Sequence, residues 1–177
     1  MNSPLERYAK PLAMSRTALR TLVKLNVLMG FLIFALLIAS LVAGGPVMRA
    51  LGVRPTPDSA TLILGMRGIM LIGILAVPLT HVVFTRLLAI VETVNAGEPF
   101  VAENAARLQT IAWAVLGLEL MHIVVGIVAA RASAGTQKLD IDWNFSLTRS
   151  LAILLLFVLA RVFDQGARMR DELAATV

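Results

Sequence analysis

The chain has 177 residues, of which 58% are hydrophobic and only 15% charged, and its formal net charge is +5. A soluble globular domain has about 45–50% apolar and about 25% charged residues, so this composition indicates a membrane protein and excludes a disordered chain. The absence of cysteine excludes a disulfide scaffold and any Cys-ligated metal or iron–sulfur site. The length gives room for one domain without a separate catalytic part, so we expect no enzymatic activity and no cofactor.

The first apolar run predicts a membrane-spanning helix over about residues 25–45. A basic segment, residues 1–24, precedes this run, and Gly44-Gly45-Pro46 ends it. A secretory signal is the alternative interpretation, because small residues cluster at the end of the run. The apolar core of a signal has about 7–15 residues, whereas this run is longer. We therefore predict a retained helix, since about 20 apolar residues cross a bilayer.

Two further apolar runs, residues 62–84 and 111–130, predict the second and third spans. Between them, Gly97 suits a left-handed helix end, and Pro99 prevents the helix from continuing. A new helix is expected to start near Val101. Its first turns place apolar side chains at helical spacing on one side: Val101, Ala105, Leu108 and Ala112.

The fourth predicted span covers residues 147–163. Arg149 and Arg161 bracket its apolar part, and the helix is long enough only if both side chains snorkel toward the membrane surfaces. The tail, residues 164–177, is expected to continue as a cytoplasmic helix, because opposite charges recur there at i, i+4 spacing.

The loop before the fourth span alternates apolar and polar residues from Leu139 to Phe145, which predicts a short, half-buried strand. The expected fold is therefore an all-α integral membrane protein: one domain, residues 1–177, built as an up-down-up-down bundle of four transmembrane helices. A short strand-like extracytoplasmic loop would join the third and fourth helices.

The distribution of positive charge predicts the topology. Four spans place both termini on one side of the membrane, together with the loop around residues 85–110. The cytoplasmic side of a membrane protein carries the excess of Lys and Arg, and we therefore expect both termini in the cytoplasm. Ten of the 16 Lys and Arg residues fall on this side: Arg7, Lys10, Arg16, Arg20, Lys24, Arg86, Arg107, Arg161, Arg168 and Arg170.

Of the ionisable residues inside predicted spans, three are candidates for a polar core, because charge within the membrane is costly and indicates function by default. Glu119 lies near the middle of the third span, His122 lies three residues on along the same helix face, and Arg67 lies near the outer end of the second span. One interpretation is an intramembrane polar core that responds to a proton or a ligand. The other is an interhelical contact that fixes packing. Di-iron bundles use the Glu-x-x-His spacing but need two such motifs, so we predict no metal.

Two segments of the sequence resemble segments of a known protein family. Residues 97–108 read GEPFVAENAARL, and residues 159–173 read LARVFDQGARMRDEL. In order and spacing they resemble the bacterial membrane family catalogued as domain of unknown function 2975, whose members have four spans. Members often close with Asp-Leu-Glu-Gly-Thr-Val, and this chain departs from that ending with ELAATV at residues 172–177.

The resemblance implies a multi-pass protein of the bacterial inner membrane without an established catalytic activity. Such proteins are commonly encoded beside a small helix-turn-helix DNA-binding regulator, which implies a membrane sensor or anchor that binds this regulator at its cytoplasmic face. The chain itself is not expected to bind nucleic acid. The residues expected to form the partner-binding face are Pro99, Phe100, Asn104, Arg107, Arg161, Phe163, Gly166 and Arg168.

The alternative is a small transporter or channel-like subunit that acts as a homo-oligomer. Glu119 and Arg67 would then line a path through the membrane. The sequence offers no inverted repeat of the kind that many transporters show.

Overall fold

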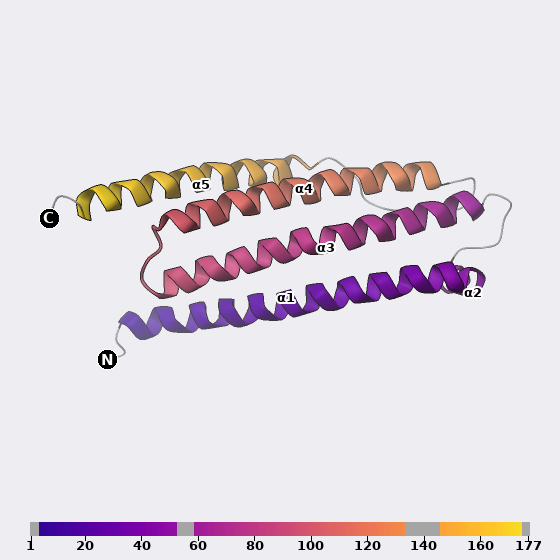
Figure 1. Cartoon of the computed structure of the whole chain (residues 1–177), viewed down its shortest axis with the longest axis horizontal. Coiled ribbons are helices and arrows are strands. Elements are labelled where there is room, and N and C mark those ends of the chain that lie inside the picture. Colours follow the sequence, from indigo (N-terminus) through magenta and orange to yellow (C-terminus); the bar gives the residue numbers. More distant parts are fainter. Residues whose placement is uncertain (1–3, 53–58, 134–145, 175–177) are drawn as a thin grey trace. The chain divides into compact units, whose positions relative to one another are not determined.

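The computed structural model describes residues 4–52, 59–133 and 146–174. Every regular element in these residues is a helix, as the all-α prediction requires (Figure 1). The predicted strand within residues 139–145 lies outside the described residues. The helices, in chain order, are α1 (Pro4–Val42), α2 (Gly44–Ala50), α3 (Ser59–Asn95), α4 (Ala102–Ala132) and α5 (Leu147–Ala174).

Three helices in the described part of the chain are long and apolar enough to cross a membrane. These are Met14–Val42 of α1, Ala60–Asn95 of α3 and Ala102–Ala132, which is all of α4. They correspond to the first three predicted spans. Helix α5 contains the fourth predicted span but is not one of the three, so the number of crossings stays a prediction.

The buried apolar side chains are mostly small and many large ones are exposed, which is the reverse of their distribution in a soluble protein. The buried hydrophobic residues are mostly alanines, such as Ala112 and Ala129. Large apolar side chains are instead exposed along α1 and α5, among them Phe31 of α1 and Leu154 of α5. Small residues let membrane helices approach closely while large apolar residues face the lipid chains. The exposed side chains therefore fit a chain whose outer surface is covered by lipid.

The chain divides into two compact units. We call the first the terminal unit; it comprises Met1–Asn26, Leu79–Leu116 and Leu147–Val177. We call the second the middle unit; it comprises Val27–Pro78 and Gly117–Ser146. Helices α1, α3 and α4 contribute to both units, whereas α5 belongs to the terminal unit alone.

Glycines allow close helix contact in the middle unit. A Cβ atom added at Gly65 of α3 would overlap the Cβ of Ala132 in α4, and one added at Gly30 of α1 would lie 3.0 Å from Cγ1 of Val77 in α3. The absence of a side chain at these positions thus permits α1 to pack on α3 and α3 on α4.

Candidate functional site

The loop between α3 and α4 begins with a glycine in the left-handed conformation. Gly97 has φ +82°, and its N–H donates to the carbonyl of Val94 at 3.1 Å. The N–H of Glu98 donates to the carbonyl of Thr93 at 3.0 Å. This pair of hydrogen bonds is the Schellman arrangement that ends a helix. The predicted left-handed end at Gly97 is confirmed.

Asn104, in the first turns of α4, holds this loop in place. Its side chain is fully buried. Nδ2 donates to the carbonyl of Pro99 at 2.9 Å and to the hydroxyl of Thr93 at 2.7 Å. Oδ1 accepts a hydrogen bond of 2.8 Å from Nη1 of Arg107, which also donates to the carbonyl of Ala89 at 3.4 Å. One amide side chain thus joins the end of α3, the loop and the start of α4.

The second half of α5 packs against the same loop. The rings of Phe100 and Phe163 lie 5.4 Å apart between centroids. A Cβ atom at Gly166 would lie 3.1 Å from the ring of Phe100, so glycine leaves room for that ring. Arg170 donates to the carbonyl of Phe100 at 3.3 Å and pairs with Glu98 at 3.6 Å. The tail helix and the α3–α4 loop therefore form one continuous surface, which we call the tail–loop surface (residues 97–101 and 161–173).

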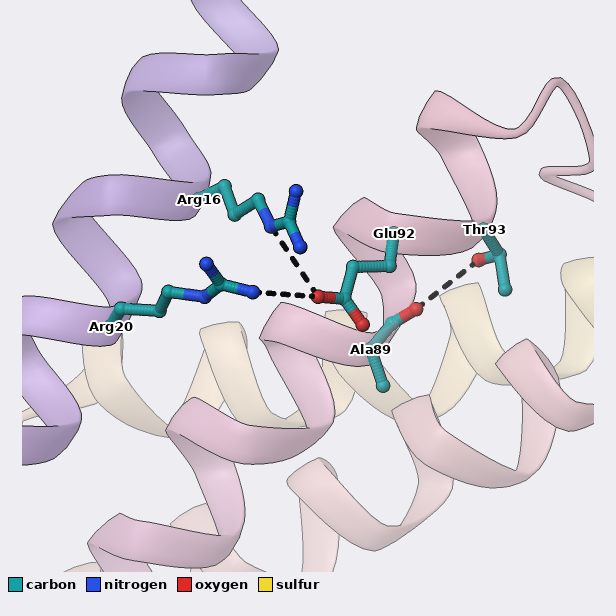
Figure 2. A network of polar contacts seen from close by, with 5 residues as sticks. All are labelled: Arg16, Arg20, Ala89, Glu92 and Thr93. Atoms are coloured by element: carbon teal, nitrogen blue, oxygen red, sulfur yellow. Dashed lines mark hydrogen bonds and ion pairs between the residues drawn. The ribbon is translucent and has the colours of Figure 1, made fainter.

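The basic N-terminal part of α1 contacts the end of α3 through ion pairs. Nε of Arg16 and Nη2 of Arg20 lie 3.5 and 3.6 Å from the same Oε1 atom of Glu92, as Figure 2 shows. At the next residue, the hydroxyl of Thr93 donates to the carbonyl of Ala89 at 3.4 Å. The side chains of Arg16, Arg20 and Glu92 are about half exposed. Exposed ion pairs contribute little to stability. These contacts therefore orient the start of α1 against the end of α3 and add little to the free energy of unfolding.

Arg67 lies in the middle unit and interacts with the end of α1. Its Nε donates to the hydroxyl of Ser40 at 3.2 Å, and its Nη2 donates to the carbonyl of the same residue. Ser40 is in the last turn of α1, where helix carbonyls lack intrahelical partners and the helix dipole is negative. A guanidinium at this position donates a hydrogen bond to the free carbonyl, and its positive charge interacts favourably with the negative end of the helix dipole. Arg67 thus caps α1.

Glu119 and His122 also lie in the middle unit, on α4. Glu119 is buried, with 9% of its surface exposed, and the Nε2 atom of His122 is buried without a hydrogen-bond partner among the described residues. The hydrogen bonds described for Arg67 go to Ser40. The observed contacts of Arg67 therefore favour the packing interpretation for that residue. The other two residues of the predicted polar core, Glu119 and His122, both lie on α4.

Comparison with known protein families places the chain. A family model described as a protein of unknown function (DUF2975) matches residues 26–177. The chain belongs to the DUF2975 family. No curated protein and no solved structure matches it. The DUF2975 match includes Glu92 but begins after Arg16 and Arg20, so the two arginines that contact Glu92 lie outside the part that defines the family.

The structure brings together three of the predicted partner-binding residues of this DUF2975 protein. Phe100, Phe163 and Gly166 lie in the contact between the loop and α5. Pro99 lies in the same loop, where its carbonyl accepts a hydrogen bond from Asn104 of α4. Asn104 requires a correction, because a fully buried amide cannot touch a partner directly; its role is to position Pro99. The remaining three predicted residues are Arg107, which is partly buried and bound to Asn104, and Arg161 and Arg168, which are exposed.

Sequence reasoning missed Glu92, Glu98 and Arg170. Glu98 and Arg170 are far apart along the chain and belong to no local pattern, so only the folded structure pairs them. A weak signal existed for Glu92, because it is a lone acidic residue near the end of an apolar helix in a basic region. Within the described residues, no group of three or more His, Cys, Asp or Glu side chains could hold a metal ion.

Proposed function

We propose that this DUF2975 protein is a non-enzymatic membrane regulator whose tail–loop surface holds a small helix-turn-helix DNA-binding protein at the cytoplasmic side of a bacterial inner membrane. Release or retention of that protein would couple the state of the membrane to transcription. The proposal takes its partner class from the family resemblance and its binding surface from the contacts of the terminal unit.

The observation that carries the proposal is the docking of α5 on the α3–α4 loop. Phe100 packs on Phe163, and Arg170 bridges to Glu98 and to the carbonyl of Phe100. These contacts join the two segments by which the chain resembles its family, and they lie in the unit that contains the basic start of α1. Because the α3–α4 loop and α5 form this surface together, a movement of either segment would change the shape that a partner meets.

The chemistry exposed on this surface suits a protein partner. Met169 and Leu173 are 60% and 71% exposed beside Arg168, whose side chain is 73% exposed. Exposed apolar side chains with adjacent arginine are enriched where proteins bind one another. The guanidinium of Arg168 is also held by Asp164 at 3.1 Å, so it is presented in a defined direction.

Glu119, which is buried, and His122, whose Nε2 atom is buried, are the candidates for the sensing part. A signal can shift the protein toward a releasing conformation only if it binds the two conformations with different affinity. A buried carboxylate beside a buried imidazole edge is where a change of charge would bias helix packing most strongly. The alternative function is a homo-oligomeric transporter in which Glu119 and Arg67 line a path, and proteoliposome flux that disappears in Glu119→Gln would favour it.

The test is affinity purification of the full chain from its native cells in a mild detergent, followed by mass spectrometry. We expect a small helix-turn-helix protein to co-purify with the wild type and to be lost when residues 164–177 are deleted. Because the deletion can disturb folding, Arg168→Glu and Met169→Asp are the sharper variants. Both residues are exposed, and each change should lower recovery about tenfold or more, as loss of an interface hot spot does.

The matched control is Arg49→Glu, which makes the same charge change at an exposed residue of α2 in the middle unit. It should leave recovery unchanged. Recovery of the helix-turn-helix protein at wild-type levels by both tail variants would refute the tail–loop surface as its binding site. Its absence from wild-type preparations would refute the regulator function itself.

A further inference from the structure

A groove lies between α4 and α5 in the terminal unit, and it shares Arg161 and Asp164 with the tail–loop surface. Its volume is about 390 Å³, within the usual range for small-molecule sites of about 300–1,000 Å³. Three alanines of α4 and Ala160 of α5 form its walls, with Phe157 at one end. Gln109, Arg161 and Asp164 supply its polar groups. The groove thus combines a wall of alanines with polar groups that supply more than half of its accessible surface.

The charged part of the groove carries a positive charge that is open to a ligand. Asp164 is neutralised by Arg168, whose Nη2 lies 3.1 Å from its Oδ2. Arg161 takes part in none of the hydrogen bonds or ion pairs among the residues that the structure describes. A guanidinium presents five donors in a planar fork that matches the oxygens of a phosphate. The groove therefore favours an anionic ligand at Arg161.

The position of the groove along the helices indicates the membrane surface. Along α5 the chain changes from apolar to charged at Arg161, after an unbroken apolar run from Leu151 to Ala160. Two aromatic pairs lie on either side of Arg161 along α5: Trp113 with Phe157, at 5.3 Å between centroids, and Phe100 with Phe163. Tryptophan gathers where the acyl chains of a bilayer meet its headgroups, and an arginine near the end of a membrane helix extends toward those headgroups.

We propose that this groove binds an anionic phospholipid, with the headgroup phosphate on Arg161 and an acyl chain along the alanine wall toward Phe157. Alanine side chains leave the width that a chain needs, and Gln109 can add a neutral hydrogen bond. This site goes beyond the proposed regulator function and does not depend on it. A lipid held there would touch the start of the tail–loop surface at Arg161 and Asp164.

The experiment is native mass spectrometry of the full chain, released from detergent after equilibration with phosphatidylglycerol and phosphatidylcholine in equal amounts. We expect the wild type to retain phosphatidylglycerol preferentially, in one molecule per chain. Arg161→Gln should lower its retention about tenfold, the usual effect of losing a charge-assisted hydrogen bond. Arg161→Lys keeps the charge without the planar fork and should retain an intermediate amount.

A second variant tests the groove without a change of charge. Ala106 is an exposed lining residue, so Ala106→Phe fills the groove from its rim with little risk to folding. It should also lower retention, while Arg49→Gln, outside the groove, should not. Circular dichroism with wild-type helix content in each variant establishes that the fold is intact.

Three results would overturn the proposal. One is equal retention of both lipids by the wild type, and another is unchanged retention in both Arg161→Gln and Ala106→Phe. The third is displacement of the bound lipid by millimolar inorganic phosphate, which would show that the groove holds a free anion rather than a lipid. None of these results bears on recovery of the helix-turn-helix partner, so this proposal and the regulator function fail separately.

Discussion

At the scale of single residues, the most constrained polar group of the terminal unit is the side chain of Asn104. A buried amide is costly unless its hydrogen bonds are made. Here Pro99 and Thr93 accept from it, and Arg107 donates to it. The family resemblance implied that Asn104 touches a partner, whereas the structure buries its side chain in contacts within the chain.

We expect Asn104→Ala to destabilise the protein by about 1–3 kcal/mol, because the change leaves the partly buried carbonyl of Pro99 without its donor. The free energy of unfolding can be measured by titration with sodium dodecyl sulfate in mixed micelles. Asn95→Ala is the matched control, since Asn95 is exposed at the end of α3. Equal effects of the two substitutions would contradict the role assigned to Asn104.

Glu92 gives a prediction of the opposite kind. Its ion pairs with Arg16 and Arg20 are half exposed and longer than 3.4 Å, so Glu92→Gln should lower stability by less than about 1 kcal/mol. The difference should shrink as salt is raised from about 0.01 to about 1 M, because salt screens exposed charges. An effect that is independent of salt would show that Glu92 acts through packing instead.

At the scale of helices, the close approach of α3 and α4 depends on Gly65. A methyl group there would overlap the Cβ of Ala132, whereas one at Gly68 would lie 3.7 Å from Cγ1 of Val128, an ordinary contact. Gly65→Ala should therefore cost about 1–3 kcal/mol, as overpacking does, and Gly68→Ala should cost less. The same micelle titration compares them. Similar values for both variants would mean that the two helices can separate without loss.

The sequence predicted where helices lie better than where they end. Hydropathy placed the first three spans, but it registers only their apolar parts, and α1 continues as a helix through the basic residues before position 25. Gly44-Gly45-Pro46 was expected to end the first helix, yet only Ala43 interrupts it and α2 follows at once. Proline is tolerated in the first turn of a helix, where its missing N–H has no partner to lose.

At the scale of the whole molecule, the contacts of the tail were beyond the reach of sequence reasoning. Hydropathy and charge assigned residues 85–110 and 161–177 to one side of the membrane, but they could not pair Phe100 with Phe163 or Glu98 with Arg170. Such contacts depend on how α4 and α5 are placed side by side. Local hydropathy patterns predict the helices. The residues of the candidate site are far apart along the chain, and no repeating sequence pattern connects them.

These same contacts bear on the number of membrane crossings. Helix α4 leads away from the loop at residues 96–101 and is long and apolar enough to cross a bilayer. Arg170 nevertheless returns to Glu98. The tail can reach that loop only if α5 brings the chain back to the side where α4 began. We therefore expect four crossings, although Arg149 and Arg161 shorten the apolar part of α5.

Cysteine labelling tests this topology, because the natural chain has no cysteine. We expect Asn95→Cys and Met169→Cys to resist a membrane-impermeant maleimide in intact cells and to react after permeabilisation. Leu51→Cys, in the turn after α2, should react in both cases. All three residues are exposed, so protection reports the side of the membrane rather than burial. Reaction of Met169→Cys in intact cells, with Asn95→Cys still protected, would place the tail on the other side and remove the basis of both the four-span bundle and the tail–loop surface.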